Sequence, residues 1–311
     1  MSDLAFTLPD PVILAIPAFV GLAALEILVA RLRRHPAYEL RDTAASLTMG
    51  LVNLVQAVLF SGLIWWSLQA THQWRLFDLP FTIWTWVALL FAEDLVYYWF
   101  HRLSHEHRIW WAAHVNHHSS QHYNLSTALR QHWTGNLVFT WALWLPLALV
   151  GFPPALIVFQ KGISLVYQFW IHTEQIRRLP RWFEAVFNTP SHHRVHHATN
   201  PRYLDRNYAG IFIIWDKLFG SFAPEDDAEP CRYGIVKNLG SFNPLRIAFH
   251  EWVEIGRDLR RAASLKEALG YLFGPPGWQP GGSGVTSDVL RARWQADQAA
   301  VKTTAEKTAA E

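Results

Sequence analysis

Nine of the 16 histidines lie in closely spaced motifs or directly after an apolar run. A His-x3-His motif is followed by two copies of His-x2-His-His, and one further histidine lies between these copies. Residues three and four apart share one helix face, so each motif turns its imidazoles the same way. Imidazole binds iron, copper, nickel and zinc, and three motifs together supply enough nitrogen ligands for two neighbouring metals. We predict that the ligands are His101, His105, His114, His117, His118, His172, His193, His196 and His197.

The remaining histidines lack this spacing. A lone histidine is more often a surface or core residue than a ligand, and we expect that ordinary role for five of them. Two others adjoin the motifs, and for these both roles stay open. The five are His35, His72, His122, His132 and His250, and the two are His107 and His192.

The composition indicates an integral membrane protein made of helices. Hydrophobic residues make up 51% of the 311 residues, aromatic residues 14%, and there are 17 tryptophans. Three segments approach the roughly 20 apolar residues that cross a bilayer: 11–30, 46–68 and 81–100. Segments 136–150 and 155–171 are shorter, so they form either two thin crossings or a re-entrant hairpin. We therefore predict an all-α protein with four to five membrane or re-entrant helices, capped by a histidine-rich di-metal domain.

The distribution of arginine predicts which side of the membrane the histidines face. Short loops rich in Lys and Arg are retained in the cytoplasm. Arg31, Arg33, Arg34 and Arg41 follow the first apolar segment and Arg177, Arg178 and Arg181 follow the last, whereas the loop after the second has only Arg75. This asymmetry predicts a multi-pass protein with every proposed ligand facing the cytoplasm. The acidic start, with Asp3 and Asp10, argues against a removable signal peptide.

Two simpler features limit the partners. The single cysteine, Cys231, permits no internal disulfide and fits a reducing compartment. The net charge of +2 gives no indication of nucleic-acid binding.

We expect three parts along the chain. Residues 1–225 form the membrane domain with its cytosolic cap, 226–294 form an irregular and amphipathic segment, and 295–311 form a flexible tail. Residues 245–273 interleave leucine and alanine with Arg and Lys. This pattern fits either a helix lying along the membrane interface or an ordinary packed surface helix.

Five stretches of the sequence resemble the fatty acid hydroxylase / sterol desaturase superfamily, and within it the alkylglycerol monooxygenase subfamily. They are HRLSH, HVNHHSSQHYNLSTALRQHW, FWIHTE, NTPSHHRVHH and NYAGIFIIWDKLFGSF, and the resemblance covers about residues 20–222. It implies a non-haem di-iron oxygenase in which the nine histidines hold two iron ions on the cytosolic side of a small membrane bundle. Gln168 replaces a further histidine of some relatives, and Gln121 a glutamate usual in the subfamily. These departures leave the lipid and the electron donor open.

The resemblance implies a monooxygenase that uses O2 to hydroxylate a C–H bond of a lipid. O-alkyl cleavage of alkylglycerols with tetrahydrobiopterin is the first alternative. The second is a fatty acyl, sterol or carotenoid hydroxylase or desaturase that takes electrons from a separate ferredoxin or cytochrome. The third is a non-catalytic metal-binding transporter or sensor, which the gathering of histidines at one membrane face disfavours. A zinc-only protein would lack the redox chemistry.

Two carboxylates are candidate catalytic residues. Asp94 lies in an apolar segment, seven residues before His101, where it could accept a hydrogen bond from a ligand imidazole or only hold helices together. Glu93 is less well aligned. Glu174 could orient a ligand, bind a pterin, or be a surface carboxylate. Three further residues stand at family-like positions without an assigned role: Asn124, Asn188 and Asp205.

Overall fold

The computed structural model describes residues 8–34 and 37–310, and this part of the chain is helical. Its β-structure is limited to two isolated bridges, Phe187 with Phe212 and Ala198 with Tyr233. The predicted all-α class is therefore confirmed for the described residues. His35 lies outside them.

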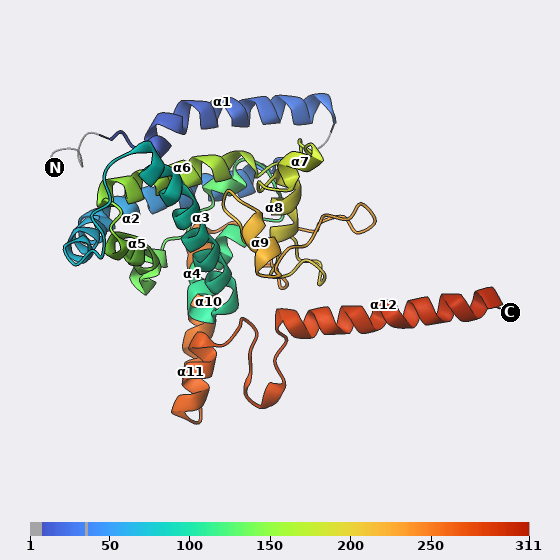
Figure 1. Ribbon diagram of the computed structural model, residues 1–311. Helices are drawn as coiled ribbons and strands as arrows, with labels where there is room; N and C mark the ends of the chain where they lie inside the picture. Colours follow the sequence, from blue (N-terminus) through green and yellow to red (C-terminus); the bar gives the residue numbers. More distant parts are fainter. Residues whose placement is uncertain (1–7, 35–36, 311) are drawn as a thin grey trace.

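Three long helices come first: α1 (Pro11–Leu32), α2 (Leu40–His72) and α3 (Ile83–Glu106) (Figure 1). Each begins where a side chain caps free backbone N–H groups. Asp10 Oδ1 accepts from Val12 N at 2.8 Å, and Thr82 Oγ1 accepts from Thr85 N at 3.2 Å. The helices extend beyond the predicted apolar segments. A helix continues as long as its backbone hydrogen bonds continue, whatever the polarity of its side chains. The last turns of α3 consequently carry His101 and His105.

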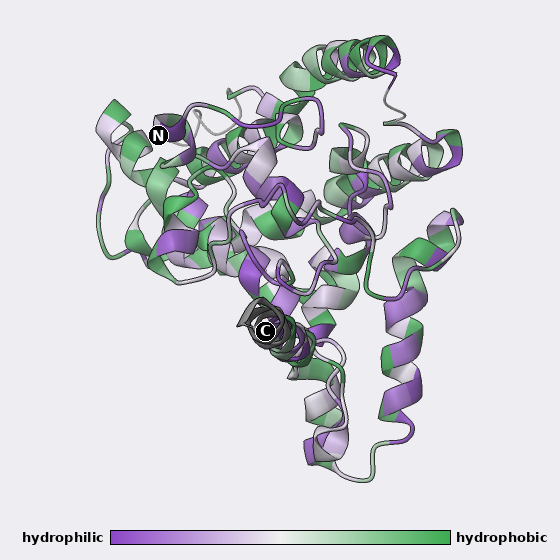
Figure 2. Cartoon of the chain, turned by 90° about the vertical axis from the view of Figure 1, so that its right-hand side faces the viewer, coloured by the Kyte–Doolittle hydropathy of each residue, from purple (hydrophilic) through white to green (hydrophobic). Residues whose placement is uncertain are grey.

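Within the described residues, α1 and α2 are long and apolar enough to cross a membrane. Their large side chains point outward, with Val20 65% and Leu59 75% exposed. Figure 2, which views α1 nearly end-on at the top, shows it as mostly hydrophobic. An apolar surface of this extent needs a lipid or protein partner. The start of α3 is also apolar and exposed at Trp84, but the same helix buries Glu93 and Asp94.

Residues 135–170 form a short arm and a longer helix. The arm consists of η3 (Gly135–Val138), η4 (Thr140–Trp144) and α5 (Leu145–Val150), and the longer helix is α6 (Pro154–Trp170). α5 packs on α2, and α6 packs on α1 and α3. The turn between them needs Gly151, whose φ is +126° and where a Cβ atom would lie 2.1 Å from Phe77 O. The turn therefore lies against the α2–α3 loop, at the end of α3 opposite its histidines.

The histidine-rich cap consists of short helices and loops. α4 follows α3 almost directly, η2 comes next, and the other cap helices come after α6 (Figure 1). The cap elements are α4 (Arg108–His118), η2 (Thr127–Leu129), α7 (Arg181–Glu184), α8 (Pro190–His196) and α9 (Ile214–Leu218).

The C-terminal region is more helical than the irregular segment and tail expected from the sequence. It contains α10 (Pro244–Leu259), α11 (Leu265–Phe273), η5 (Pro280–Gly282) and α12 (Ser287–Ala310). α10 and α11 pack on α4, where Arg108 forms ion pairs with Glu251 and Asp258. The expected tail lies in α12, which extends away from the rest of the chain (Figure 1).

Candidate metal centre

The nine histidines singled out by their spacing form two buried groups in which the ring nitrogens converge. Within each group, one nitrogen from every ring lies within 4.8 Å of all the others. The five-histidine group contains His101, His105, His114, His118 and His196, and the four-histidine group contains His117, His172, His193 and His197. Histidines 72, 107, 122, 132, 192 and 250 stay outside both groups.

Each His-x2-His-His motif divides its rings between the two groups, so the expectation that every motif turns its imidazoles the same way is wrong for these two motifs. His114 and His118, four apart on α4, join the five-histidine group, while His117 turns to the other. The second motif mirrors this division: its outer pair, four apart, joins the four-histidine group, and the middle residue, His196, reaches across. Because i and i+4 share a helix face and i+3 is rotated by about 100° from i+4, one motif can serve two neighbouring metals.

The nitrogen separations match those around a metal ion. His114 Nε2 lies 3.0 Å from His101 Nε2 and 3.2 Å from His118 Nε2. His172 Nε2 lies 3.2 Å from His117 Nε2 and 3.0 Å from His193 Nε2. Bonds of about 2.1 Å place cis nitrogens about 3.0 Å apart in an octahedron and about 3.4 Å in a tetrahedron. Both groups therefore have the dimensions of a metal-binding site.

Hydrogen bonds outside the groups fix the ring tautomers. The Nδ1 atoms of His101, His172 and His196 donate to carbonyl oxygens at 2.8, 2.7 and 2.9 Å. A carbonyl only accepts, so the proton is on Nδ1 and the Nε2 lone pair faces the centre. The Nε2 atoms of His105 and His196 are buried and have no hydrogen-bond partner among the described residues. A bound metal would satisfy both atoms.

Burial keeps these imidazoles neutral. It lowers the pKa of His114 and of His197 well below the usual value, and neighbouring imidazoles lower it further. Burial also lowers the pKa of His172 to about 4. Metal binding requires the neutral ring, so the centre is in its binding form at neutral pH without having to lose protons.

One loop, Leu204–Tyr208, supplies three of the outer hydrogen-bond acceptors. His105 Nδ1 lies 3.3 Å from Asp205 Oδ1, His196 donates to Arg206 O, and His101 donates to Tyr208 O. Asp205 and Asn207 adopt left-handed φ angles of +56° and +55°, which Asp and Asn tolerate better than most residues. The sequence alone assigns no role to Asp205. In the structure its carboxylate lies next to His105, a predicted ligand.

Asp94 contacts backbone and indole N–H groups and no ligand imidazole, so of the two roles considered for it, holding structural elements together fits its partners. It accepts from Ile211 N at 2.7 Å, Phe212 N at 2.9 Å and Trp215 Nε1 at 3.0 Å. Seven residues along a helix correspond to about 10 Å, which is too far from His101. Asp94 therefore braces the backbone just after Tyr208. Gly210 permits this approach, because a Cβ there would lie 2.8 Å from Asp94 Oδ1.

The other predicted polar residues also contact protein groups. Glu93 Oε1 accepts from Trp144 Nε1, and the half-buried Glu174 accepts from Tyr233 Oη at 3.1 Å. The amides of Asn124 and Asn188 donate to backbone carbonyls. Gln168, the departure from relatives with an extra histidine, turns its amide to Ser164 Oγ.

Sequence reasoning missed Glu26, a buried carboxylate in α1. It accepts from Tyr38 Oη, from Thr173 Oγ1 and, at 2.8 Å, from Leu125 N. Thr173 directly follows His172, so Glu26 ties α1 to the four-histidine group. The signal was available: a carboxylate in an otherwise apolar segment, which is what drew attention to Asp94.

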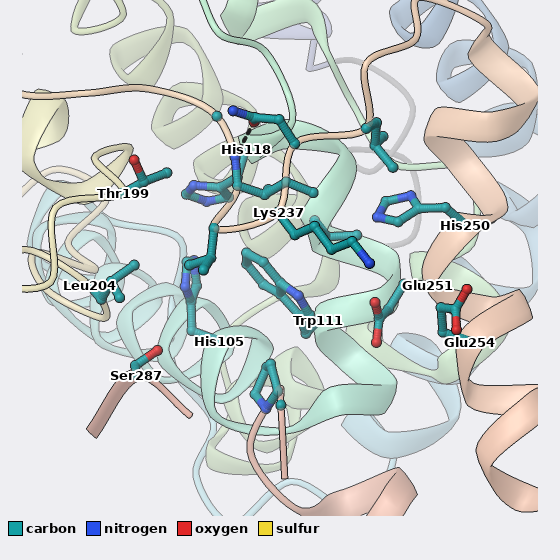
Figure 3. A pocket seen from close by; sticks show the side chains of 18 of the residues that line it. His105, Trp111, His118, Thr199, Leu204, Lys237, His250, Glu251, Glu254 and Ser287 are labelled. Atoms are coloured by element: carbon teal, nitrogen blue, oxygen red, sulfur yellow. Dashed lines mark hydrogen bonds between the residues drawn. The ribbon is translucent and has the colours of Figure 1, made fainter. Parts of the chain in front are cut away.

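A cavity of about 950 Å³ reaches both histidine groups. One wall contains His105, His118, His196 and His197. The opposite wall comes from residues 234–239 and α10, with Trp111 between the two walls (Figure 3). The two histidine groups are thus buried, but they are open to this cavity, which is large enough for a sizeable ligand.

Comparisons with known proteins agree with the motifs. Residues 86–221 match the fatty acid hydroxylase family model. Alkylglycerol monooxygenase of Homo sapiens is 40% identical over 276 residues, covering 88% of this chain and 61% of that protein. The Caenorhabditis elegans alkylglycerol monooxygenase is 35% identical, covering 78% and 50%. Ornithine lipid hydroxylase of Rhizobium tropici is 30% identical over 137 residues, covering 44% and 40%.

The chain therefore carries a fatty acid hydroxylase domain, as its motifs predict. It spans about three fifths of the length of the vertebrate alkylglycerol monooxygenases that it matches. No solved structure matches it.

Proposed function

We propose that this protein is a membrane-bound, non-haem di-iron monooxygenase that hydroxylates a C–H bond of a lipid, with alkylglycerol ethers as its first substrate class. One observation carries the proposal: two buried histidine groups with converging Nε2 atoms lie side by side beneath a large cavity. The similarity to alkylglycerol monooxygenases over most of the chain supports the substrate class.

The donor set fits two iron ions, one in each histidine group. Iron bound there supplies O2 activation, which zinc, having no redox chemistry, does not. The chain's own contribution is to orient the rings through Asp205, Arg206 O, Tyr208 O and Gln168 O, and to exclude water by burying all nine imidazoles. Asp94 acts as a positioning residue through the backbone after Tyr208.

The proposed reaction balances with an external two-electron donor. Hydroxylation of the ether CH2 consumes one O2, two electrons and two protons, and releases one water. The product is a hemiacetal, whose C–O bond breaks to give an aldehyde and free glycerol. Tetrahydrobiopterin would supply the electrons for this substrate class. Glu174 is the proposed pterin contact, because it is half-buried and its partner Tyr233 stacks on Tyr123, which in turn stacks on His172.

Membrane placement follows from the apolar surfaces. In our proposal α1, α2 and α3 cross the bilayer, and the short arm with α6 forms a re-entrant hairpin. α5 with η4 comprises residues 140–150, which at about 1.5 Å per residue reach only about half the roughly 30 Å of hydrocarbon. Arg33 Nη1 donates to Gln175 O at 2.9 Å, so the two arginine-rich segments meet beside the histidines. We therefore place the centre on the cytoplasmic face.

The domain boundaries follow the same division. We propose residues 1–225 as the hydroxylase domain and 226–294 as a C-terminal wall that covers α4. Residues 295–311 are the remainder of the chain, and their described part continues α12.

The test is turnover by iron-loaded protein in membranes. 1-O-hexadecylglycerol, O2 and tetrahydrobiopterin should give hexadecanal, and His196→Ala should abolish the product. His72→Ala, at the far end of α2, is the matched control and should retain activity. Hydroxylated fatty acyl or sterol lipid formed with a ferredoxin and its reductase would replace the alkylglycerol assignment. No product with any donor, despite two bound irons, would overturn the oxygenase proposal.

A further inference from the structure

The cavity wall opposite the histidines comes from residues that the family model does not match. Residues 234–239 and α10 follow the matched segment 86–221. From α10, Leu245, Phe249 and Val253 line the cavity at intervals of four residues and so form one apolar stripe along the helix. Trp111 continues the apolar surface toward His105 and His118 (Figure 3). The cavity thus offers an apolar path between α10 and the metal centre.

His250 places an unused hydrogen-bond acceptor on this wall. Its Nδ1 donates to Ile247 O at 3.0 Å, so the lone pair is on Nε2. That Nε2 is buried and meets no hydrogen-bond partner in the described part of the chain, although His250 lines the cavity. Figure 3 shows its ring across the cavity from His105 and His118. A buried acceptor without a donor points to a donor brought by a ligand.

The polar groups around His250 limit the kind of ligand. Glu251 and Glu254 line the cavity and are paired, with Arg108 and Arg257 respectively. Lys237 and Arg246 line the same wall, and among the described residues neither side chain has an ion-pair partner. These two cations alone would accept an anionic head group, but a fully ionised group has no hydrogen to donate to His250 Nε2. A neutral hydroxyl suits the set, because it can donate to His250 Nε2 and accept from Lys237 Nζ.

We infer that α10 recognises the head group of the lipid. His250 accepts a hydrogen bond from a head-group hydroxyl, and the apolar stripe binds the part of the alkyl chain nearest to the head group. This inference rests on the proposed lipid oxygenase function. It adds His250 and Lys237 as specificity-determining residues and the neutral polyol head group as the feature they recognise.

Binding without turnover tests the inference. The iron-loaded protein, kept free of O2, is titrated with radiolabelled 1-O-hexadecylglycerol and with hexadecyl methyl ether, which has no hydroxyl. His250→Phe should weaken binding of the first about 3- to 10-fold, the usual range for one hydrogen bond, and leave the second unchanged. His250→Gln should restore part of the loss because its amide oxygen accepts. His72→Phe, outside the cavity, should change neither ligand.

The outcomes separate this inference from the function it rests on. Equal weakening of both ligands by His250→Phe, or no weakening of either, would overturn the head-group role. Weaker binding of tetrahydrobiopterin with unchanged lipid binding would assign the wall to the pterin instead, and would also overturn it. Because binding is measured without O2, an enzyme that binds selectively but forms no product contradicts only the oxygenase proposal. Unfolding temperatures of all variants confirm that they are folded.

Discussion

The two histidine groups use the same ligand atom but depend on different parts of the molecule. In the five-histidine group, three rings donate to acceptors on the single loop Leu204–Tyr208. In the four-histidine group, His172 is held by Gln168 O at the end of α6, and its neighbour Thr173 is tied to Glu26 of α1. His193 Nδ1 is buried with no partner in the described residues. One histidine group is therefore held in place by the cap, and the other by apolar helices of the bundle.

The ligand counts differ as well. In six-coordinate geometry, five imidazoles leave one open position and four leave two. The four-histidine group thus has more open positions for an exogenous ligand. It also has fewer nitrogen ligands, so the loss of one should weaken metal binding more. We expect the two groups to respond differently to the same kind of mutation.

Removal of a ligand gives the largest expected effect. His193→Ala leaves three imidazoles in the four-histidine group, so we expect loss of that metal and of turnover, by more than the ~100-fold typical of outer-shell changes. His114→Ala leaves four in the other group and should retain both metals, with reduced turnover. Metal content per chain and product formation measure the two effects. Equal metal loss in both variants would contradict the distinction.

Asp94→Asn should have the next largest effect, because it lowers the stability of the folded protein. Asp94 receives three hydrogen bonds while fully buried, and an amide brings a donor against those N–H groups. We expect a loss of roughly 2–4 kcal/mol in unfolding free energy. Iron release from the five-histidine group should follow because Tyr208 is displaced. Asp297→Asn, at an exposed position of α12, is the control, and a similar loss of stability there would contradict the role given to Asp94.

Asp205→Asn should weaken one metal selectively. The amide keeps the size of the side chain but removes the charge beside His105. A lost outer carboxylate typically costs about 10–100-fold in metal affinity. Competition with a chelator should show this loss at one of the two irons only. Weakening of both irons together would argue that the groups are not independently braced.

Glu26→Gln is the counterpart in the membrane bundle. The amide can still accept from Leu125 N but cannot satisfy both hydroxyl donors equally well. Since Thr173 and not His172 is contacted, we expect a loss of about 3- to 10-fold in affinity for the second iron. Unchanged chelation at both sites would show that α1 does not support the centre.

Glu174→Gln should have the smallest effect on the metals, because Glu174 contacts Tyr233 and not an imidazole. We expect unchanged iron content and unfolding temperature. If Glu174 binds the pterin, KM for tetrahydrobiopterin should rise about 3- to 10-fold while KM for the lipid stays constant. A fall in iron content instead would assign it to the metal site.

The spacing of the motifs predicts which histidines form the centre. It does not predict the hydrogen-bond acceptors that hold their rings in place. His-x3-His and His-x2-His-His fix which rings share a helix face, and all nine gather as expected. The partition of each motif between two groups depends on where α4 and α8 lie in space, which spacing does not give. The outer acceptors are mostly backbone carbonyls of Arg206, Tyr208 and Gln168, and such atoms carry no sequence signature.

The helices could likewise be predicted only in part. Apolar segments located α1, α2 and the first part of α3, because hydrophobic runs mark lipid-facing surface. The polar extensions of these helices, and the packing of α10 and α11 on α4, depend on caps and on ion pairs such as Arg108 with Glu251. Asp94 was singled out correctly as a buried carboxylate, but its partners lie more than a hundred residues away along the chain.

Mössbauer spectroscopy of anaerobic protein loaded with iron-57 tests the central claim most directly. Two irons per chain, in two distinct high-spin ferrous environments of equal area, are what a five-histidine and a four-histidine group predict. A single iron per chain, or two irons in one indistinguishable environment, would contradict the assignment of these nine histidines to two different sites.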